Sequence, residues 1–359
     1  MTDAIDREKL QSFAKQVSGS VVGGLNCALT LVGDQLGLFK ALADIGPAST
    51  QAIADHLDLS ERWVREWLYQ QSCIGQVSFD EATDEFYLTP EATAVLADHD
   101  HPAYLGSMFQ SVVALTESID ELPNSFRTGL GQSYDDKGEA CACGIERMSR
   151  QFQSKHLVPD LLPKLDTIIE KLQQGARVGD VGCGAATSTI AMARAFPNSE
   201  FFAYDISLHA LERANANITE SGLTNITLLN PEEQGLTEDE SFDLITTFDV
   251  IHDSTHPDQL ISAIRASLKP DGTWLCADIK GQPTFAENLK HNNMATLAYS
   301  FSVLVCMSAS LSVPDGAGLG TLGFHEQKAR EMTQELGFSN FRTIEYAGDV
   351  FNSFYEIRP

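Results

Sequence analysis

The chain has 359 residues, 43% of them hydrophobic and 21% charged, so its composition excludes disordered and fibrous proteins and its length favours two domains. Its 24 Lys and Arg stand against 50 Asp and Glu, which gives a net charge of −26. A surface this acidic repels nucleic-acid phosphates and anionic lipids, and we therefore expect neither nucleic acid nor a membrane as a partner.

Two long uncharged stretches, at 16–33 and 291–314, resemble membrane spans in length. Both contain several Ser, Gly or Asn residues, which make them too polar to cross a bilayer, so we expect two buried helices. In the first stretch Gly19, Gly23 and Gly24 would let another helix approach closely. This helix is therefore a candidate contact in a homodimer.

The segment 51–88 has the pattern of a winged helix. Alternating residues at 76–79 and 85–88 predict two short strands around a polar turn. Before them, apolar spacing predicts helices at 51–57 and 61–71, the second with four residues on one face: Trp63, Val64, Trp67 and Leu68.

Winged helices often bind DNA, and the charges of this one decide against that role. Between residues 31 and 100 only three residues are basic and thirteen are acidic. Binding to phosphates needs several Lys or Arg, which are absent here. We expect this region to serve in packing or dimerisation.

The pattern divides the chain into three parts. We predict a mainly α-helical and winged-helix domain at 1–100 and a helical connector that covers the substrate side at 101–174. From 175 to 359 strands and helices alternate, which predicts an α/β domain with a parallel sheet.

The third part opens with a strand, a glycine turn and a helix. The apolar strand at 176–181 leads into Gly182 and Gly184, which let a backbone approach a ligand closely. The next strand, at 200–204, ends at Asp205. This acid follows the turn by about 20 residues, the spacing at which a βαβ unit places a carboxylate against a ribose diol.

Two residues indicate which nucleotide is bound. Thr187 stands where a dinucleotide fold usually has a third glycine, and Asp180 directly precedes the turn. A carboxylate there repels a pyrophosphate but can hold an ammonium group, directly or through water. The pattern therefore favours an adenosine with a cationic amino-acid tail, as in S-adenosyl-L-methionine.

The motifs of this part resemble those of the class I S-adenosylmethionine-dependent methyltransferases. The resemblance rests on Asp180–Gly184, Asp205, Phe242–Asp253, Leu268–Leu275 and Asp349–Tyr355. Together with the winged helix, nearly the whole chain resembles a group of methyltransferases of small-molecule type, some of them labelled transcriptional regulators. Two segments, Tyr299–Leu304 and Gly318–Thr321, fit that group, whereas Phe324–Glu326 departs from it.

The resemblance implies a Rossmann-like methyltransferase domain that ends in an antiparallel hairpin of 341–346 and 353–357. It also implies a set of residues around the cofactor S-adenosyl-L-methionine. These are Asp180, Gly182 and Gly184 at the methionine end, Asp205 at the ribose, Ile206 at the adenine, Asn230 or Glu232 at its amino group, and Phe248 and Asp249 beneath the sulfonium.

His252 and Asp253 follow the strand at 242–248, on the edge of the sheet where ligands bind. The pair resembles the His-Asp pair of small-molecule O-methyltransferases, in which the histidine is a general base. Methyl transfer to a hydroxyl requires that a proton be removed, so His252 is our candidate base. The alternative is that His252 only caps a loop or orients the cofactor.

Acceptor contacts must come from outside the Rossmann core. The connector offers Tyr134, Met148 and Phe152, and the insertion after the fifth strand offers Tyr299 and Phe301. His325 follows a glycine-rich stretch and could reach the pocket from a lid. The same apolar residues could be plain core. If they line a pocket, the acceptor is a small, partly hydrophobic molecule.

The seven cysteines are scattered and odd in number, which is typical of reduced thiols in a cytoplasmic protein. Cys141 and Cys143 form the only close pair and have no His cluster beside them, so we expect no metal site. Residues 1–9 lack an apolar stretch, so we expect no signal peptide.

Two other functions stay open at this point. The first is a transcriptional regulator that senses S-adenosylmethionine through the third part and uses the winged helix. The second is a nicotinamide-dependent oxidoreductase, which Asp180 and Thr187 disfavour.

Overall fold

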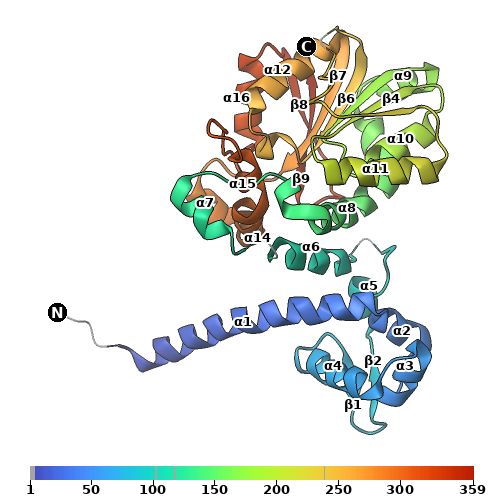
Figure 1. Ribbon diagram of the computed structural model, residues 1–359, viewed down its shortest axis with the longest axis vertical. Coiled ribbons are helices and arrows are strands. Elements are labelled where there is room, and N and C mark those ends of the chain that lie inside the picture. The colour runs from blue at the N-terminus through green and yellow to red at the C-terminus, as the bar shows by residue number, and fades with distance from the viewer. Residues whose placement is uncertain (1–4, 102, 117–118, 238) are drawn as a thin grey trace. The chain divides into compact units, whose positions relative to one another are not determined.

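A computed structural model describes residues 5–101, 103–116, 119–237 and 239–359 (Figure 1). The chain forms two compact units, residues 1–114 and 115–359, each with its own hydrophobic core. The boundary between the units falls within the predicted connector. The predicted division at residues 100 and 174 stays a prediction.

The first unit contains a winged helix, as the sequence predicts. Ile53, Leu68 and Phe86 lie at its centre and are almost fully buried. Its elements in chain order are α1 (Arg7–Gln35), α2 (Leu38–Ile45), α3 (Thr50–Leu57), α4 (Glu61–Cys73), β1 (Ser78–Asp80), β2 (Glu85–Tyr87) and α5 (Pro90–Leu96), followed by α6 (Gly106–Thr116), whose end crosses the unit boundary.

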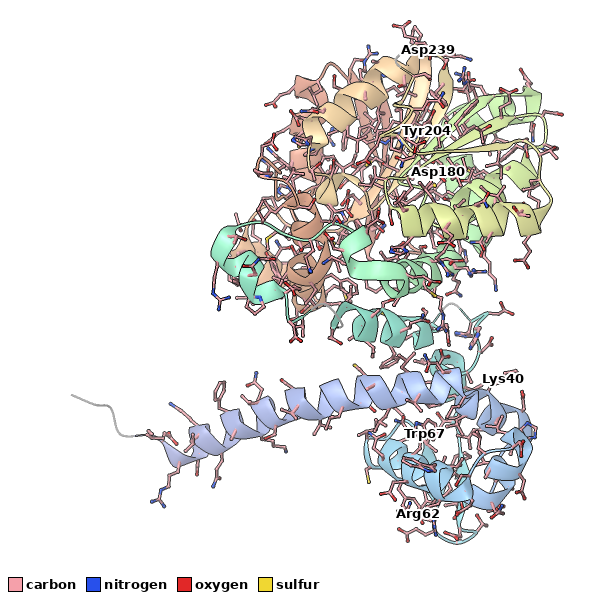
Figure 2. All side chains as sticks on the ribbon, in the orientation of Figure 1. Lys40, Arg62, Trp67, Asp180, Tyr204 and Asp239 are labelled. Atoms are coloured by element: carbon pink, nitrogen blue, oxygen red, sulfur yellow. The ribbon has the colours of Figure 1, made fainter. Side chains whose placement is uncertain are left out.

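The predicted apolar face of α4 needs one correction. Val64, Trp67 and Leu68 are buried, and the indole of Trp67 donates a hydrogen bond to the carbonyl of Leu29 (Figure 2). Trp63, however, is 80% exposed. Because each helical residue advances about 100°, the core-facing side chains at 64, 67, 68 and 71 leave position 63 outside the buried arc.

The prediction of a buried helix at 16–33 is wrong for the single chain. Within α1 only Thr30, Leu31 and Gly33 are buried, because only the end of the helix packs on α4. By length and composition α1 is also long and apolar enough to cross a membrane. Only 17% of its most apolar 18-residue window is buried inside the protein. The second stretch behaves as predicted, since Ala295–Ser310 forms a helical run with many buried residues.

The second unit is built on a seven-stranded sheet in the order β5-β4-β3-β6-β7-β9-β8. The first five of these strands are parallel, and β9 pairs antiparallel with both β7 and β8, which confirms the predicted C-terminal hairpin. The strands are β3 (Arg177–Val181), β4 (Glu200–Tyr204), β5 (Ile226–Leu229), β6 (Phe242–Phe248), β7 (Leu268–Ile279), β8 (Asn340–Ile344) and β9 (Asn352–Arg358).

Helices cover both faces of this sheet (Figure 1). One face packs on α9 (Ile168–Gln174) and α10 (Thr187–Ala195), while α11 (Leu208–Ser221) lies beside α10. The other face packs on α12 (Pro257–Ser267) and α16 (Glu326–Glu335). Successive residues of β6, Leu244 and Ile245, enter the two opposite cores, as the alternation of a strand buried on both faces requires.

The remaining elements cover the carboxyl edge of the sheet or precede it. They are α7 (Leu122–Thr128), the single turn η1 (Asp135–Lys137), α8 (Gly138–Lys155), the short turns η2 (Leu157–Leu161) and η3 (Leu162–Lys164), η4 (Ile251–Asp253), α13 (Phe285–His291), α14 (Ala295–Phe301), η5 (Ser302–Cys306) and α15 (Met307–Ser310). Strand order reverses between β3 and β6, and ligands of such sheets bind at that point.

Candidate active site

The glycine turn after β3 has the backbone conformation that its sequence predicts. Gly182 and Gly184 have φ values of 71° and 54°, in the left-handed region that favours glycine. A Cβ atom on Gly182 would lie 2.4 Å from Cγ2 of Val250. No atom lies within 4 Å of the corresponding position on Gly184. Gly182 is therefore required by packing, and Gly184 borders open space.

Asp205 lies at the end of β4, directly beside this turn. One carboxylate oxygen accepts a hydrogen bond from the backbone N–H of Gly184 at 2.8 Å, and the other accepts one from Ser207 at 2.9 Å. Burial raises the pKa of Asp205, and the nearby acids Asp180 and Asp135 raise it further. Each oxygen keeps a lone pair for another donor, so the carboxylate can accept two ligand hydroxyls.

Asp180 is 1% exposed and lies at the centre of the sheet (Figure 2). Its carboxylate accepts hydrogen bonds from three hydroxyls: Ser188 at 2.7 Å, Thr189 at 2.6 Å and Thr246 at 2.8 Å. Burial raises the pKa of this group. These hydrogen bonds connect the first turn of α10 to β3 and β6. The geometry therefore favours a structural role for Asp180 over direct contact with an ammonium group.

The end of β6 carries Phe248 and Asp249. Phe248 packs edge-to-face on Phe152, with ring centroids 6.4 Å apart. Asp249 has a φ of 58° and accepts a hydrogen bond from the side-chain amide of Asn352 at 2.8 Å. Burial and the nearby Asp278 raise the pKa of Asp249 to about 7. This carboxyl group therefore takes up a proton much more easily than an exposed aspartate.

His252 is 2% exposed and its partner is Asp278, at the end of β7. The ring Nδ1 lies 2.7 Å from Oδ1 of Asp278, which also accepts the backbone N–H of Ile279. Burial lowers the pKa of His252, but the Asp278 carboxylate outweighs it and holds the pKa well above 6.5. With Nδ1 donating to Asp278, the lone pair on Nε2 is directed away from the carboxylate.

Asp253 has a different partner, the phenol of Tyr134. The tyrosine O–H donates to Oδ2 of Asp253 at 2.5 Å. Burial raises the pKa of Asp253 to about 6, against the opposing effects of His252 and the Tyr134 hydrogen bond. The adjacent pair His252-Asp253 is thus not a hydrogen-bonded pair in the structure.

The turn that carries Tyr134 contacts the cofactor side as well. Its next residue, Asp135, accepts hydrogen bonds from the hydroxyl of Ser207 at 2.7 Å and the backbone N–H of Leu208 at 3.2 Å. Both donors lie just after Asp205. The segment 134–135 therefore joins the ends of β4 and β6 across the site.

Tyr134 packs against an apolar cluster. This cluster consists of buried and half-buried residues of the cover: Leu115, Cys141, Ile145, Phe301, Leu304, Val305 and Cys306. Backbone contacts hold this cover together, because Gly131 donates to the carbonyl of Leu311 at 2.8 Å and Gln132 donates to the hydroxyl of Ser308 at 2.9 Å. The structure thus brings Tyr134 and Phe301 together beside His252 and Asp253.

Comparisons with known proteins agree with this geometry. Residues 172–312 match the family model described as a methyltransferase domain, and residues 25–98 match the Rv2258c-like winged HTH domain. The methyltransferase match thus covers the glycine turn, Asp205, His252 and Asp278. The chain's resemblance to class I methyltransferases with an N-terminal winged helix, and its Rossmann-like fold, are therefore confirmed.

Curated relatives cover part of the chain. A ubiquinone biosynthesis O-methyltransferase of Actinobacillus pleuropneumoniae is 33% identical over 150 residues, which are 40% of this chain and 62% of that protein. A release factor glutamine methyltransferase of Rhodopirellula baltica is 31% identical over 190 residues, 46% of this chain and 64% of that protein. The chain thus spans less than two thirds of each.

Solved structures match the whole chain in fold. Human N-acetylserotonin methyltransferase, solved in complex with S-adenosylmethionine, aligns with a TM-score of 0.68 and 15% identity over 100% of this chain and 99% of that one. An O-methyltransferase family protein from Burkholderia thailandensis gives a TM-score of 0.66 at 13% identity, with 99% and 98% covered.

The other predicted site residues are placed less centrally in the methyltransferase domain. Ile206 is 57% exposed beside Asp205, and Asn230 accepts the backbone N–H of Glu232 in a local turn after β5. Met148 is 38% exposed on α8. Tyr299 packs on Phe285, with centroids 5.8 Å apart.

Two predicted contacts have structural tasks. Phe152 belongs to the core under the sheet, where its ring stacks with Phe354 at 5.5 Å. His325 is the N-cap of α16, and its Nδ1 accepts the backbone N–H of Lys328 at 3.3 Å. In the structure His325 therefore caps a helix, and its lid role stays a prediction. The glycine-rich stretch before it instead anchors the site, since Gly320 donates to the carbonyl of His252.

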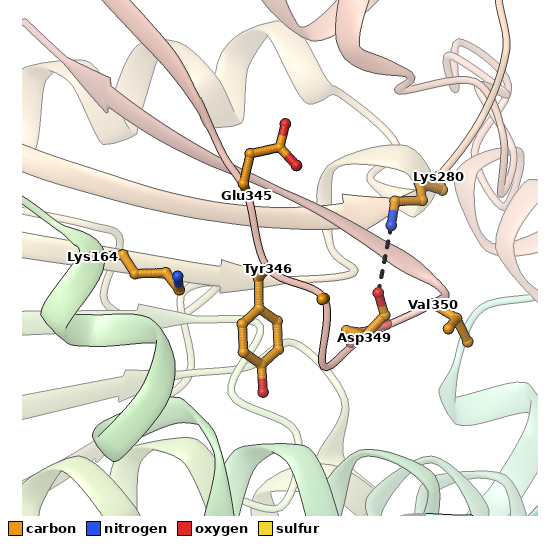
Figure 3. A pocket seen from close by; sticks show the side chains of 7 residues that line it. Lys164, Lys280, Glu345, Tyr346, Asp349 and Val350 are labelled. Atoms are coloured by element: carbon orange, nitrogen blue, oxygen red, sulfur yellow. Dashed lines mark hydrogen bonds between the residues drawn. The ribbon is translucent and has the colours of Figure 1, made fainter.

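A separate hollow lies at the turn between β8 and β9 (Figure 3). The ammonium of Lys280 donates to the backbone carbonyl of Asp349 there at 3.4 Å. Seven residues line the hollow, and none is a predicted site residue: Lys164, Lys280, Glu345, Tyr346, Ala347, Asp349 and Val350.

Sequence reasoning missed Asp278, the partner of His252. The signal was available, because an acid at the end of β7 must lie near residues that follow the neighbouring parallel strand β6. It also missed Lys137 and Cys306, which belong to the cover. No local pattern marks these two, since they are neighbours in the fold although far apart in the sequence.

Proposed function

We propose that this chain transfers a methyl group from S-adenosyl-L-methionine to a small-molecule acceptor, with His252 as general base. One observation carries the proposal: a buried His252–Asp278 pair lies on the same sheet edge as the glycine turn and Asp205. The named relatives, which are methyltransferases, support it.

The residues at the end of β3 and β4 fit this cofactor. Asp205 can accept both ribose hydroxyls, Ile206 offers an exposed apolar surface for the adenine, and the open side of Gly184 leaves room for the amino-acid tail. When bound, S-adenosyl-L-methionine supplies a methyl group that its sulfonium already activates.

The chain's own residues then align the acceptor, exclude water and take a proton. With Nδ1 hydrogen-bonded to Asp278, His252 presents Nε2 to the acceptor hydroxyl and accepts its proton there. Asp278 stabilises the imidazolium that results. Asp253 is a positioning residue in this proposal, since it holds Tyr134 in the cover.

The acceptor is a small molecule with apolar surface, because the cover beside His252 is lined by aromatic, aliphatic and thiol side chains. Incubating the protein with methyl-labelled S-adenosylmethionine and a metabolite extract, then identifying labelled products, tests the proposal. Wild type should label at least one small molecule and His252→Ala should not. No labelled product with wild type would contradict it.

A DNA-reading role is disfavoured by the ion pairs of the winged helix. Lys40 pairs with Asp44 at 2.8 Å, Arg62 with Glu66 at 2.5 Å and Arg65 with Glu61 at 3.4 Å. These are the three basic residues between positions 31 and 100, and each lies beside an acid. We expect no gel shift at low salt. Calorimetry with NAD separately tests the oxidoreductase alternative and should show no binding.

We also propose a homodimer formed through α1. Five exposed apolar residues occupy one face of this helix: Leu10, Phe13, Val17, Val21 and Leu25. Replacing Val17 and Val21 together by Asp should convert a dimer to a monomer in light scattering, whereas Ser12→Asp on the opposite face should not. Wild type of monomer mass would contradict the idea. We place the protein in the cytoplasm, where its seven cysteines, all free in the structure, stay reduced.

A further inference from the structure

Lys137 is a buried cation without an acidic partner. It ends the turn η1 and is 7% exposed. Its ammonium hydrogen-bonds the side-chain oxygen of Gln132 at 3.4 Å, and no ion pair joins it to a carboxylate in the part of the chain that the structure describes. Burying an ammonium group without a counter-charge is unfavourable. The position therefore calls for an explanation.

Two other buried charged groups of the same unit have partners of opposite charge. Glu146, 2% exposed, forms ion pairs with Arg150 and Arg213. Glu356, 3% exposed, is held in the same way by two arginines, Arg342 and Arg358. The fold thus pairs two buried carboxylates with cations, whereas the buried ammonium of Lys137 has no carboxylate partner among the described residues.

The groups nearest to Lys137 do not supply a buried negative charge. Burial raises the pKa of Cys141 to about 11, so that thiol stays neutral. Asp136 is exposed and accepts both the N–H and the hydroxyl of Ser133. Burial lowers the pKa of Lys137 itself, as expected for an ammonium group that lacks a counter-charge.

The location of Lys137 points to the acceptor. Cys306 packs in the same cluster as Tyr134 and is an electrostatic neighbour of both Lys137 and His252, so the ammonium and the candidate base both lie near this thiol. Three residues before Lys137, Tyr134 reaches Asp253. The glycine turn and Asp205 border the site on the cofactor side instead.

We propose that Lys137 binds a carboxylate of the acceptor, so that the acceptor is a hydroxylated, partly apolar acid. The inference rests on the proposed methyl transfer and narrows its substrate class. Gln132 orients the ammonium, and the apolar cluster around Tyr134 receives the rest of the molecule. The bound carboxylate supplies the counter-charge of the ammonium, and it sets the acceptor in one orientation before His252.

A carboxylate is also present in the amino-acid tail of the cofactor, and the experiment separates the two sources. The protein is saturated with S-adenosylhomocysteine, and calorimetry measures binding of benzoate, phenylacetate and 3-phenylpropionate, each beside its carboxamide. Wild type should bind at least one acid tenfold or more tightly than its amide. Lys137→Gln should abolish that preference, Lys137→Arg should keep most of it, and exposed Lys290→Gln should leave it unchanged.

Several results would overturn the inference. Equal binding of every acid and its amide by wild type removes the carboxylate subsite. A preference that survives in Lys137→Gln assigns the subsite to another residue. If Lys137→Gln instead weakens S-adenosylhomocysteine tenfold, the ammonium holds the cofactor's carboxylate and the acceptor assignment is wrong. A wild type that binds no S-adenosylhomocysteine contradicts the proposed function itself, which is a different outcome.

Discussion

The proposed cofactor half and the proposed acceptor half of the site lie on one sheet edge but are constructed differently. The cofactor half consists of a glycine turn and an acid whose hydrogen bonds join the ends of two neighbouring strands, β3 and β4. The acceptor half joins His252, Asp278, Tyr134 and Cys306, which come from four separate segments. The first half depends on backbone conformation, and the second depends on how the cover packs. Substitutions in each half should therefore have separable effects.

The largest expected effect lies in the acceptor half. His252→Ala removes the base and should lower turnover by about 10²–10⁴-fold, with cofactor affinity nearly unchanged. The measurement is the single-turnover rate at saturating cofactor, beside calorimetry for the cofactor. His56→Ala, which removes an exposed histidine of α3, is the matched control. In wild type, activity should rise with pH with a midpoint above 6.5, because Asp278 raises the pKa of His252 and only neutral imidazole accepts a proton.

A normal rate in His252→Ala would contradict the general-base role but not the proposed methyltransferase activity. This result is expected if the acceptor has already lost its proton, because no base is then needed. A joint loss of stability and cofactor affinity would instead make His252 a structural residue. Both results would remove the separation between the two halves.

Two glycine substitutions test how the stability of the fold depends on the backbone conformation of the cofactor half. Gly182→Ala combines a φ of 71° with a Cβ 2.4 Å from Val250 and should destabilise the fold by about 2–5 kcal/mol. Gly184→Ala has a φ of 54° and no steric conflict, so it should cost about 1 kcal/mol. Denaturant unfolding compares them. Equal losses would show that the contact with Val250 does not matter.

Asp205→Ala should act on binding alone. Loss of charge-assisted hydrogen bonds to the ribose should weaken S-adenosylmethionine by about 1.5–3 kcal/mol, while the rate at saturating cofactor stays within a few-fold of wild type. Calorimetry and single-turnover kinetics together measure this. An unchanged affinity would remove Asp205 from the cofactor site.

The smallest expected effect on turnover comes from replacing the partner of His252 in the acceptor half. Asp278→Asn keeps the shape of the His252 partner but removes its charge, and it should reduce turnover about tenfold. Because the carboxylate raises the pKa of His252, its loss should also move the midpoint of the pH–rate profile to lower pH. A midpoint that stays in place would show that Asp278 does not control this histidine. Asp253→Asn is the matched variant, and it should leave the midpoint closer to wild type.

Sequence reasoning succeeded where function depends on local pattern. The winged helix, the strand and glycine turn at Val181–Gly184 and the position of Asp205 follow from periodicity and spacing within short segments, and the C-terminal hairpin follows from the family resemblance. It did less well where residues far apart in sequence meet. Trp63 was assigned to the wrong face, and His252 was paired with its neighbour Asp253 although Asp278 is its partner. The exposure of α1 also escaped prediction, because apolar composition does not say whether the covering surface belongs to the same chain.

The turn at 134–137 has a consequence for the order of binding events. Tyr134 is bonded to the segment that carries His252, and Asp135 is bonded to the segment that follows Asp205. A ligand that shifts one of these bonds must work against the other, because two adjacent residues of one short turn cannot move independently. We therefore expect occupancy of either half to change the affinity of the other, and thermodynamic linkage makes the two factors equal. Measuring acceptor affinity with and without the demethylated cofactor gives that coupling free energy directly.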